Sequence, residues 1–269
     1  MTQYKLYKGA WVSIEENKEQ MLTTEEAKLL LSKGGLFVRN VFDFDRPSTD
    51  DKGFWFVIKD TFGGLEELTS STRRDVRKGL RIYNIHQITV NELQTVGYDI
   101  FRLAQESYRV KCNAFTREEF EALIDEYEQS GNKEYWAVEH KETGEVVALG
   151  LNTIKEDSCE YNVLKCKPHA LRNGSYPYYA LIYEMNRHYL EERGLKYVND
   201  GARSMTNHSN IQPFLMQKFK FRRAYCGLKL HYKWWLAIIV KVLYPFRQVI
   251  PVKKVKMMLD MYAMSKGVM

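Results

Sequence analysis

The stretch of this chain best suited to chemistry is a Gly-containing turn between a strand and a long helix. The pattern of apolar and turn-forming residues predicts a strand over 159–165, a turn over 167–175 and a helix over 176–193. At the start of a helix, backbone N–H groups lack partners and the helix dipole favours negative charge. We therefore expect an anion to bind at this turn, such as the pyrophosphate of an acyl carrier.

A polar loop, GARSMTNHSN over 201–210, follows the next predicted strand, 196–200. The final helix is predicted to begin at Asn207, and a single N-cap accounts for only one of the polar residues in the loop. We expect the others to orient a substrate, with Arg203 pairing a substrate anion and His208 carrying a proton. The candidates in this loop are Arg203, Ser204, Asn207, His208 and Asn210.

A short basic helix is predicted over 69–81. Its Arg and Lys residues recur at spacings of three and four, so most of them share one broad face. Such a face is either a solvated helix surface or a site that captures a phosphate or carboxylate of the substrate. In the second interpretation, Arg73 and Arg77 bind substrate.

The elements that must position these residues predict an α/β fold with a mixed sheet. After the basic helix come a strand, two amphipathic helices and three strands, over 82–90, 93–110, 116–129, 133–140, 145–155 and 159–165. Before it come a helix and two strands, over 27–31, 36–45 and 53–60. Two closing strands are predicted after the final helix, over 220–226 and 228–234.

The chain is expected to divide into an N-terminal α/β extension over 1–68, a core over 69–233 and a C-terminal basic apolar segment over 234–269. The last part begins with WWLAIIVKVLYPFRQVI, which is too short an apolar run to cross a bilayer because Lys241 and Pro245 interrupt it. It either packs on the domain as a capping helix or lies over 234–256 on the surface of an anionic membrane.

The net charge of +6 conceals an asymmetry. No acidic residue lies between Asp200 and Asp260, an interval that contains twelve Lys and Arg residues. We expect this part of the chain to face a negatively charged partner, either anionic lipid or the phosphates of tRNA.

Cysteine and histidine usage favours a cytoplasmic protein without a metal site. The four cysteines form no C-x-x-C pair and lie inside predicted elements, which indicates buried thiols in a reducing compartment. The charged N-terminus has no apolar run typical of a secretory signal. The six histidines are scattered without ligand spacing, so we expect no metal ion.

The order of strand, turn, helix, strand and helix, together with two motifs, resembles the second half of the GNAT acyltransferase fold. The segment KPHALRNGSYPYY (167–179) stands where that family has the Gly-rich loop R/Q-x-x-G-x-G/A, which binds the pyrophosphate of coenzyme A. The segment SNIQPFLMQKFKF (209–221) is similar to the end of the family's last helix, with Met216 where many members have a proton-donating Tyr.

A second resemblance is to the Fem-type branch of this superfamily, the aminoacyl- and acyltransferases that modify cell-wall precursors. WFVIKD followed by LTSSTRRDVRKGLRIYNIHQI (68–88) looks like the helix S-x-x-x-R-x-x-I-x-K-x-x-K that precedes a strand in that branch. The two resemblances together cover Phe54 to Tyr232.

The resemblance implies where the donor and the catalytic base lie. The acyl carrier would lie along a strand that parts from its neighbour, and strand ends that face this crevice, Glu160 and Asp200, are candidate bases together with His208. The residues implied to contact the carrier are Asn162, Val163, Leu164, Arg172, Asn173, Gly174, Ser175 and Asn210.

These features predict an enzyme that moves an acyl group, acetyl or longer, from a coenzyme A thioester to an amine acceptor, free or lipid-linked at the inner membrane surface. The Fem-type resemblance leaves an alternative, transfer from aminoacyl-tRNA to a cell-wall precursor. Because Met216 replaces the Tyr, a third interpretation is a module of this fold that has lost catalysis and docks on anionic lipid or nucleic acid.

Overall fold

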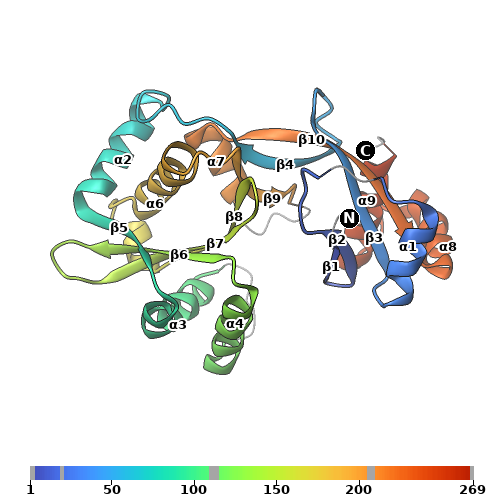
Figure 1. The fold of residues 1–269 in the computed structure, drawn as a ribbon, viewed down its shortest axis with the longest axis horizontal. Helices are drawn as coiled ribbons and strands as arrows, with labels where there is room; N and C mark the ends of the chain where they lie inside the picture. The colour runs from blue at the N-terminus through green and yellow to red at the C-terminus, as the bar shows by residue number, and fades with distance from the viewer. Residues whose placement is uncertain (1–3, 19–20, 109–114, 205–209, 267–269) are drawn as a thin grey trace. The chain divides into compact units, whose positions relative to one another are not determined.

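The computed structural model describes residues 4–18, 21–108, 115–204 and 210–266 (Figure 1). The chain forms two units. One comprises Met1–Val57, Ala202–Ser209 and Arg223–Met269, and the other comprises Ile58–Gly201 and Asn210–Arg222. We call them the first and the second unit. The strands β4 (Phe54–Lys59), β9 (Tyr197–Ala202) and β10 (Arg222–Tyr232) each begin in one unit and end in the other.

The second unit is built on a mixed sheet with the strand order β9-β8-β7-β6-β5. Four strands pair antiparallel, each with the next along the chain: β5 (Tyr83–Ile88), β6 (Lys133–His140), β7 (Val146–Ile154) and β8 (Ser158–Cys166). The last pair, β8 with β9, is parallel. Short turns join β6 to β7 and β7 to β8, whereas residues 89–132 lie between β5 and β6. The parallel pair needs a helical crossover. The segment between β8 and β9 supplies that crossover.

Helices cover both faces of this sheet (Figure 1). On one face lie α3 (Val90–Glu106) and α4 (Arg117–Ser130), whose first turns are fixed by capping boxes that start at Thr89 and Thr116. Leu93, Ile100 and Phe101 of α3 are buried against α4 and the sheet, because they recur at helical spacing on one side. On the other face lies α6 (Pro177–Asn186), which ends in a π-helical turn over Arg187–Glu192.

The helix α2 (Ser70–Ile82) packs against α6, and a glycine makes this contact possible. A Cβ atom on Gly79 would lie 2.7 Å from the backbone oxygen of Tyr176 and 3.0 Å from the Cβ of Ala180. Only a residue without a side chain therefore fits at this crossing. The contact holds the basic helix beside the turn that precedes α6.

The first unit contains the strand order β1-β2-β3-β10, with β1 (Tyr4–Tyr7), β2 (Ala10–Ser13) and β3 (Phe37–Arg46). Its helices are α1 (Thr24–Ser32), α8 (Trp234–Leu243) and α9 (Lys253–Ser265). Lys233 alone separates β10 from α8, and its backbone N–H donates to the carbonyl of Leu36, 3.2 Å away. The helix α8 thus leaves directly from the sheet.

Most elements predicted from the sequence are present, and the differences are local. The helix expected over 176–193 changes its hydrogen-bond pattern at Arg187, and a short helix α5 (Pro168–Arg172) occupies part of the predicted turn. The two closing strands are a single strand, β10, with an irregularity between Tyr225 and Gly227. The final helix, α7, spans Ile211–Phe219, and the residues 205–209 expected at its start lie outside the described part.

No helix in the described ranges is long and apolar enough to cross a membrane. The expected boundaries at 68 and 233 stay a prediction.

Replacing Gly79 with Ala is expected to lower the free energy of unfolding by about 1–3 kcal/mol, because the added methyl group overlaps the backbone of Tyr176. Urea denaturation measures the change. Ser71→Ala, at an exposed position of the same helix, is the control and is expected to change the value by less than about 0.5 kcal/mol. Equal stabilities for both variants would show that the two helices do not touch at Gly79.

Candidate functional site

The strands β8 and β9 pair over only three residues and then part. Ser158, Cys159 and Glu160 pair with Tyr197, Val198 and Asn199. Beyond Glu160, β8 continues to Cys166 and β9 continues to Ala202, and no further pair joins these two strands among the described residues. Backbone groups on that edge of β8 are therefore not used in a ladder with β9 beyond Glu160.

A β-bulge accompanies the parting. Leu151 of β7 pairs with Val163 of β8, and Asn152 pairs with Tyr161, so that Asn162 is the extra residue. A bulge bends its strand and increases the local twist. The exposed side chain of Asn162 accepts a hydrogen bond from the hydroxyl of Thr153.

The side chains next to the bulge point away from the edge of β8. Val163 packs on the core formed with α3 and α4, and Leu164 lies near Gly150 on the face that α6 covers. A carrier along β8 would therefore meet the backbone of these two residues rather than their side chains.

The turn after β8 is held from the inside by Ser175. This buried residue donates from Oγ to the carbonyl of Ala170 (3.0 Å) and accepts from the hydroxyl of Tyr83 (2.5 Å). Its backbone N–H donates to Oδ1 of Asn173 (3.0 Å), which closes a local turn. Gly174 has a φ of +69°, which glycine adopts without strain. Arg172 and Asn173 are exposed beside it.

A pocket of about 260 Å³ opens beside this turn at the start of α6. Its lining is mostly aromatic and includes Phe214 from α7: Leu171, Gly174, Tyr176, Pro177, Tyr178, Tyr179 and Phe214. Tyr176 has a left-handed backbone (φ 60°), a costly conformation for a residue with a Cβ atom, and Pro177 follows as the first residue of the helix. In the described structure, no side chain caps this helix.

Two cations of α2 lie beside the pocket. The ammonium of Lys78 would lie 3.9 Å from a Cβ atom on Gly174, and it is 5.5 Å from the ring centroid of Tyr176. Arg74 forms a bidentate contact with Asp75, 2.9 Å and 3.0 Å from its Oδ1. Asp75, and after it Tyr176, raise the pKa of Arg74. The turn thus combines the start of a helix with positive charge, which suits an anion.

The two arginines predicted on this helix are placed differently from Lys78. Arg73 pairs with Glu66 (2.9 Å) and donates to the carbonyl of Leu68 (3.3 Å), so it fastens the segment before α2. Arg77 is exposed. The spacing of basic residues in the sequence includes Lys78 and Arg74, but it does not tell which of them approach the turn.

The residues of the polar loop are only partly described. Arg203, in the first unit, donates to the carbonyls of Asp51, Lys52 and Gly53 at 2.9–3.0 Å. Its guanidinium also lies over the ring of Trp55, and burial lowers its pKa. Ser204 is exposed, as is Asn210, which precedes α7 without capping it by a side-chain hydrogen bond. Asn207 and His208 lie outside the described residues. The roles predicted for these five residues stay predictions.

Asp200 has the property expected of a general base. It lies on β9 just past the last pair with β8, and burial raises its pKa from 3.8 to about 7, with a smaller contribution from the negative charge of Glu160. The amide of Gln212, from α7, opposes this rise through a hydrogen bond. A carboxylate with a pKa near 7 accepts a proton efficiently at neutral pH.

Glu160, the other predicted base, is engaged in an ion pair. Its Oε2 lies 3.0 Å from the ammonium of Lys155. Its Oε1 would lie 4.0 Å from a Cβ atom on Gly201, so the side chain extends toward the end of β9. The structure therefore brings the two predicted carboxylates to one region, next to the parting strands.

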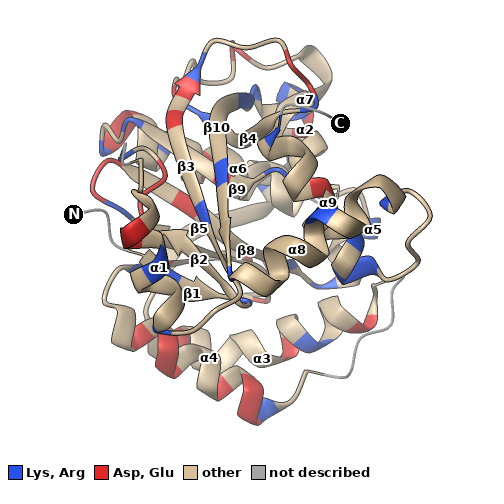
Figure 2. Ribbon diagram, turned by 90° about the vertical axis from the view of Figure 1, so that its right-hand side faces the viewer, with Lys and Arg blue, Asp and Glu red and all other residues tan. Residues whose placement is uncertain are grey.

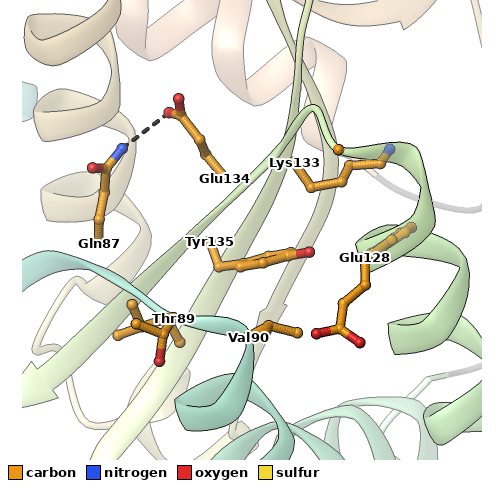
Figure 3. Close-up of a pocket in the computed structure, with 10 residues that line it drawn as sticks. Gln87, Thr89, Val90, Glu128, Lys133, Glu134 and Tyr135 are labelled. Carbon is orange, nitrogen blue, oxygen red and sulfur yellow. Dashed lines mark hydrogen bonds between the residues drawn. The ribbon is translucent and has the colours of Figure 1, made fainter.

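A second, larger pocket of about 410 Å³ lies at the opposite edge of the sheet, between β5, β6 and the helices α3 and α4. Figure 3 shows the ring of Tyr135 across it and Gln87 donating to Glu134 (2.9 Å). Lys133 in its wall donates to Thr153 (2.5 Å). No residue predicted to act in transfer lines this pocket. Over the described ranges, no group of three or more His, Cys, Asp or Glu side chains could hold a metal ion.

The fold is the mixed α/β fold that the GNAT and Fem-type motifs of the sequence predicted. The structure is similar to that of FemX, with a TM-score of 0.56 and 11% identity, covering 92% of this chain and 85% of that one. It is also similar to L-PGS from Bacillus licheniformis, with a TM-score of 0.50 and 15% identity, covering 98% and 85%. No family model and no curated protein matches the sequence.

The variant Asp200→Asn is expected to stabilise the protein more at pH 8 than at pH 4. Because folding raises this pKa, the folded protein binds the proton more tightly, and the free energy of unfolding falls as pH rises from about 4 to about 7. An Asn at this position does not titrate, so the variant avoids that loss. Its free energy of unfolding, compared with that of the unaltered protein, should be higher by about 2–4 kcal/mol more at pH 8 than at pH 4.

Urea denaturation of both proteins at the two pH values measures this difference. Glu142→Gln, at an exposed turn position, is the control and should show no pH-dependent gain. A gain for Asp200→Asn that is the same at pH 4 and pH 8 would mean that the carboxyl has an ordinary pKa.

Proposed function

We propose that the protein is an N-acyltransferase that takes an acyl group from a coenzyme A thioester and transfers it to an amine. One observation carries this proposal: β8 and β9 part after three pairs, and the chain that follows β8 forms a turn with a pocket at the start of α6, beside Lys78. An extended thioester chain would lie along the edge of β8 by backbone hydrogen bonds. Its pyrophosphate would then reach the turn at Gly174.

The chemistry at the turn supports a phosphate-bearing donor. Lys78 supplies positive charge, and the uncapped start of α6 supplies the dipole. The aromatic lining of the pocket adds apolar surface for the parts of the donor that carry no charge. Ser175, which the sequence placed among the phosphate contacts, supports the turn instead through Ala170 and Tyr83.

Asp200 is the base in this proposal. The amine nitrogen attacks the thioester carbonyl, the nitrogen–carbon bond forms, and the carbon–sulfur bond breaks. The proton of the attacking amine passes to the Asp200 carboxylate, while the sulfur leaves as thiolate and takes a proton from solvent. A base with a pKa of about 7 is half ionised at neutral pH, which suits both taking up and releasing this proton.

Lys78→Ala is expected to weaken binding of coenzyme A by about 10- to 100-fold, because it removes a charged contact to phosphate. Isothermal calorimetry with coenzyme A and with acetyl coenzyme A measures the change. Arg81→Ala, at an exposed position on the last turn of the same helix, is the control and should bind as the unaltered protein does. Unchanged binding by Lys78→Ala would remove the turn from the donor site.

Asp200→Asn is expected to lower kcat by about 10²- to 10⁴-fold with little change in KM for the thioester. In the unaltered protein, kcat/KM should rise with pH until about 7 and then level off, since the ionised carboxyl is the active form. Release of free thiol in the presence of simple amines follows the reaction. A profile without a break near pH 7 would assign the proton transfer to another group.

A second candidate, transfer from aminoacyl-tRNA, is favoured by the extent of the fold. The similarity to FemX covers 92% of this chain, so both units take part in it. Transfer of a radiolabelled amino acid from charged tRNA to an amine, with no thiol released from any coenzyme A thioester, would select this donor. If neither donor reacts and tRNA or anionic vesicles alone bind, the protein is a binding module of this fold.

A further inference from the structure

The helix α8 has two apolar faces, and only one of them is covered. Leu236 and Val240 are buried against Leu259 of α9. On the outer side, Trp234, Ile238 and Val242 form a stripe at a spacing of four, with 78%, 55% and 61% of their surfaces exposed. Trp235 and Ile239 lie next to this stripe and are also exposed. A helix that is apolar all round is normally buried on every side.

The apolar surface continues in the segment after α8. Phe246, Val249 and Val252 are exposed there before α9 begins at Lys253. Scattered exposed apolar residues are ordinary, whereas eight large ones within nineteen positions mark an interaction site. We call Trp234 to Lys256 the C-terminal surface.

The charges of the C-terminal surface are all positive. They are Lys241, Arg247, Lys253, Lys254 and Lys256. Asp260, the next acidic residue along the chain, lies 3.4 Å from Lys256. Figure 2 shows α8 as a largely uncharged helix. An apolar stripe with a tryptophan at one end and basic residues around it is typical of a segment that lies in the headgroup region of an anionic bilayer.

The charge argues against two other occupants. A second copy of this chain would bring two sets of lysines together, which is unfavourable. Nucleic acid would satisfy the lysines, but it offers no apolar phase for Ile238, Val242 and Val249. An anionic bilayer offers phosphates to the lysines and an apolar phase to the exposed apolar side chains. The helix α8 has ten residues, a length of about 15 Å, and this is enough to lie in the interface but not to cross it.

We propose that the C-terminal surface docks the protein on bilayers that contain anionic lipid, with Trp234, Ile238 and Val242 inserted among the headgroups and the lysines on the lipid phosphates. Docking depends on the first unit alone and does not require the transferase activity proposed above. An experiment can therefore contradict either proposal without contradicting the other.

Flotation with vesicles tests the proposal. The full chain is mixed with vesicles of phosphatidylcholine alone or with about one third phosphatidylglycerol, at about 0.1 M and 0.5 M salt. We expect the protein to float with the anionic vesicles at low salt and to bind neutral vesicles far more weakly. Equal binding to both compositions, or to neither, would overturn the proposal.

Two sets of variants separate the apolar and the electrostatic contributions. The first replaces Trp234, Ile238 and Val242 with Ser and should abolish flotation. The second replaces Lys253, Lys254 and Lys256 with Gln and should weaken binding to anionic vesicles about 100-fold, or about fivefold per charge. Leu29→Ser, at an exposed apolar position of α1 in the same unit, is the control and should bind normally. Full binding by either triple variant would exclude the C-terminal surface.

Tryptophan fluorescence gives a direct readout of insertion. Trp55 and Trp136 are buried, whereas Trp234 and Trp235 are exposed in the C-terminal surface, so the emission of these two should shift to shorter wavelengths and be quenched by brominated lipid. The shift should be smaller in Trp234→Phe, which still floats. A dimer in solution that dissociates in the Ser variant, without any vesicle binding by the unaltered protein, would assign the surface to self-association and overturn the proposal.

Discussion

The candidate site depends on where the pairing between β8 and β9 stops. Parallel strands normally continue side by side, because each unpaired backbone group in the interior is costly. Here the bulge at Asn162 turns β8 away from β9 immediately after the pair of Glu160 with Asn199. The same parting places Asp200 beyond the last pair, where burial favours its protonated form. The end of the pairing and the raised pKa of this carboxyl thus have one structural cause.

The second requirement of the site is the contact between α2 and the turn before α6. Because Gly79 lets α2 approach the backbone of Tyr176, a lysine one residue earlier, Lys78, lies beside Gly174. The left-handed backbone of Tyr176 is held by this packing and by Pro177, which fixes the first residue of α6. Positive charge and the start of a helix are therefore combined by residues that are distant in the sequence.

The parts of the fold that could be predicted from the sequence are those fixed by local chemistry. Capping boxes at Thr89 and Thr116 and the short continuous apolar runs in β6 and β7 specify their elements without help from the rest of the chain. The site was predicted less completely, because a serine in a turn can face a ligand or the interior. Ser175 faces inward because its hydroxyl forms hydrogen bonds with the hydroxyl of Tyr83 and the carbonyl of Ala170. Tertiary contacts likewise decide that Lys78, and not Arg73, is the basic residue of α2 that lies beside the turn.

The single residue between β10 and α8 has a consequence for any surface on that helix. Lys233 is tied by its backbone to Leu36, so α8 cannot swing freely as a tail on a long linker would. A flexible tether keeps a protein near its target but leaves it free to tumble. A helix that continues directly from a strand instead has a fixed orientation relative to its sheet. The surface that binds α8 therefore also determines the orientation of the first unit.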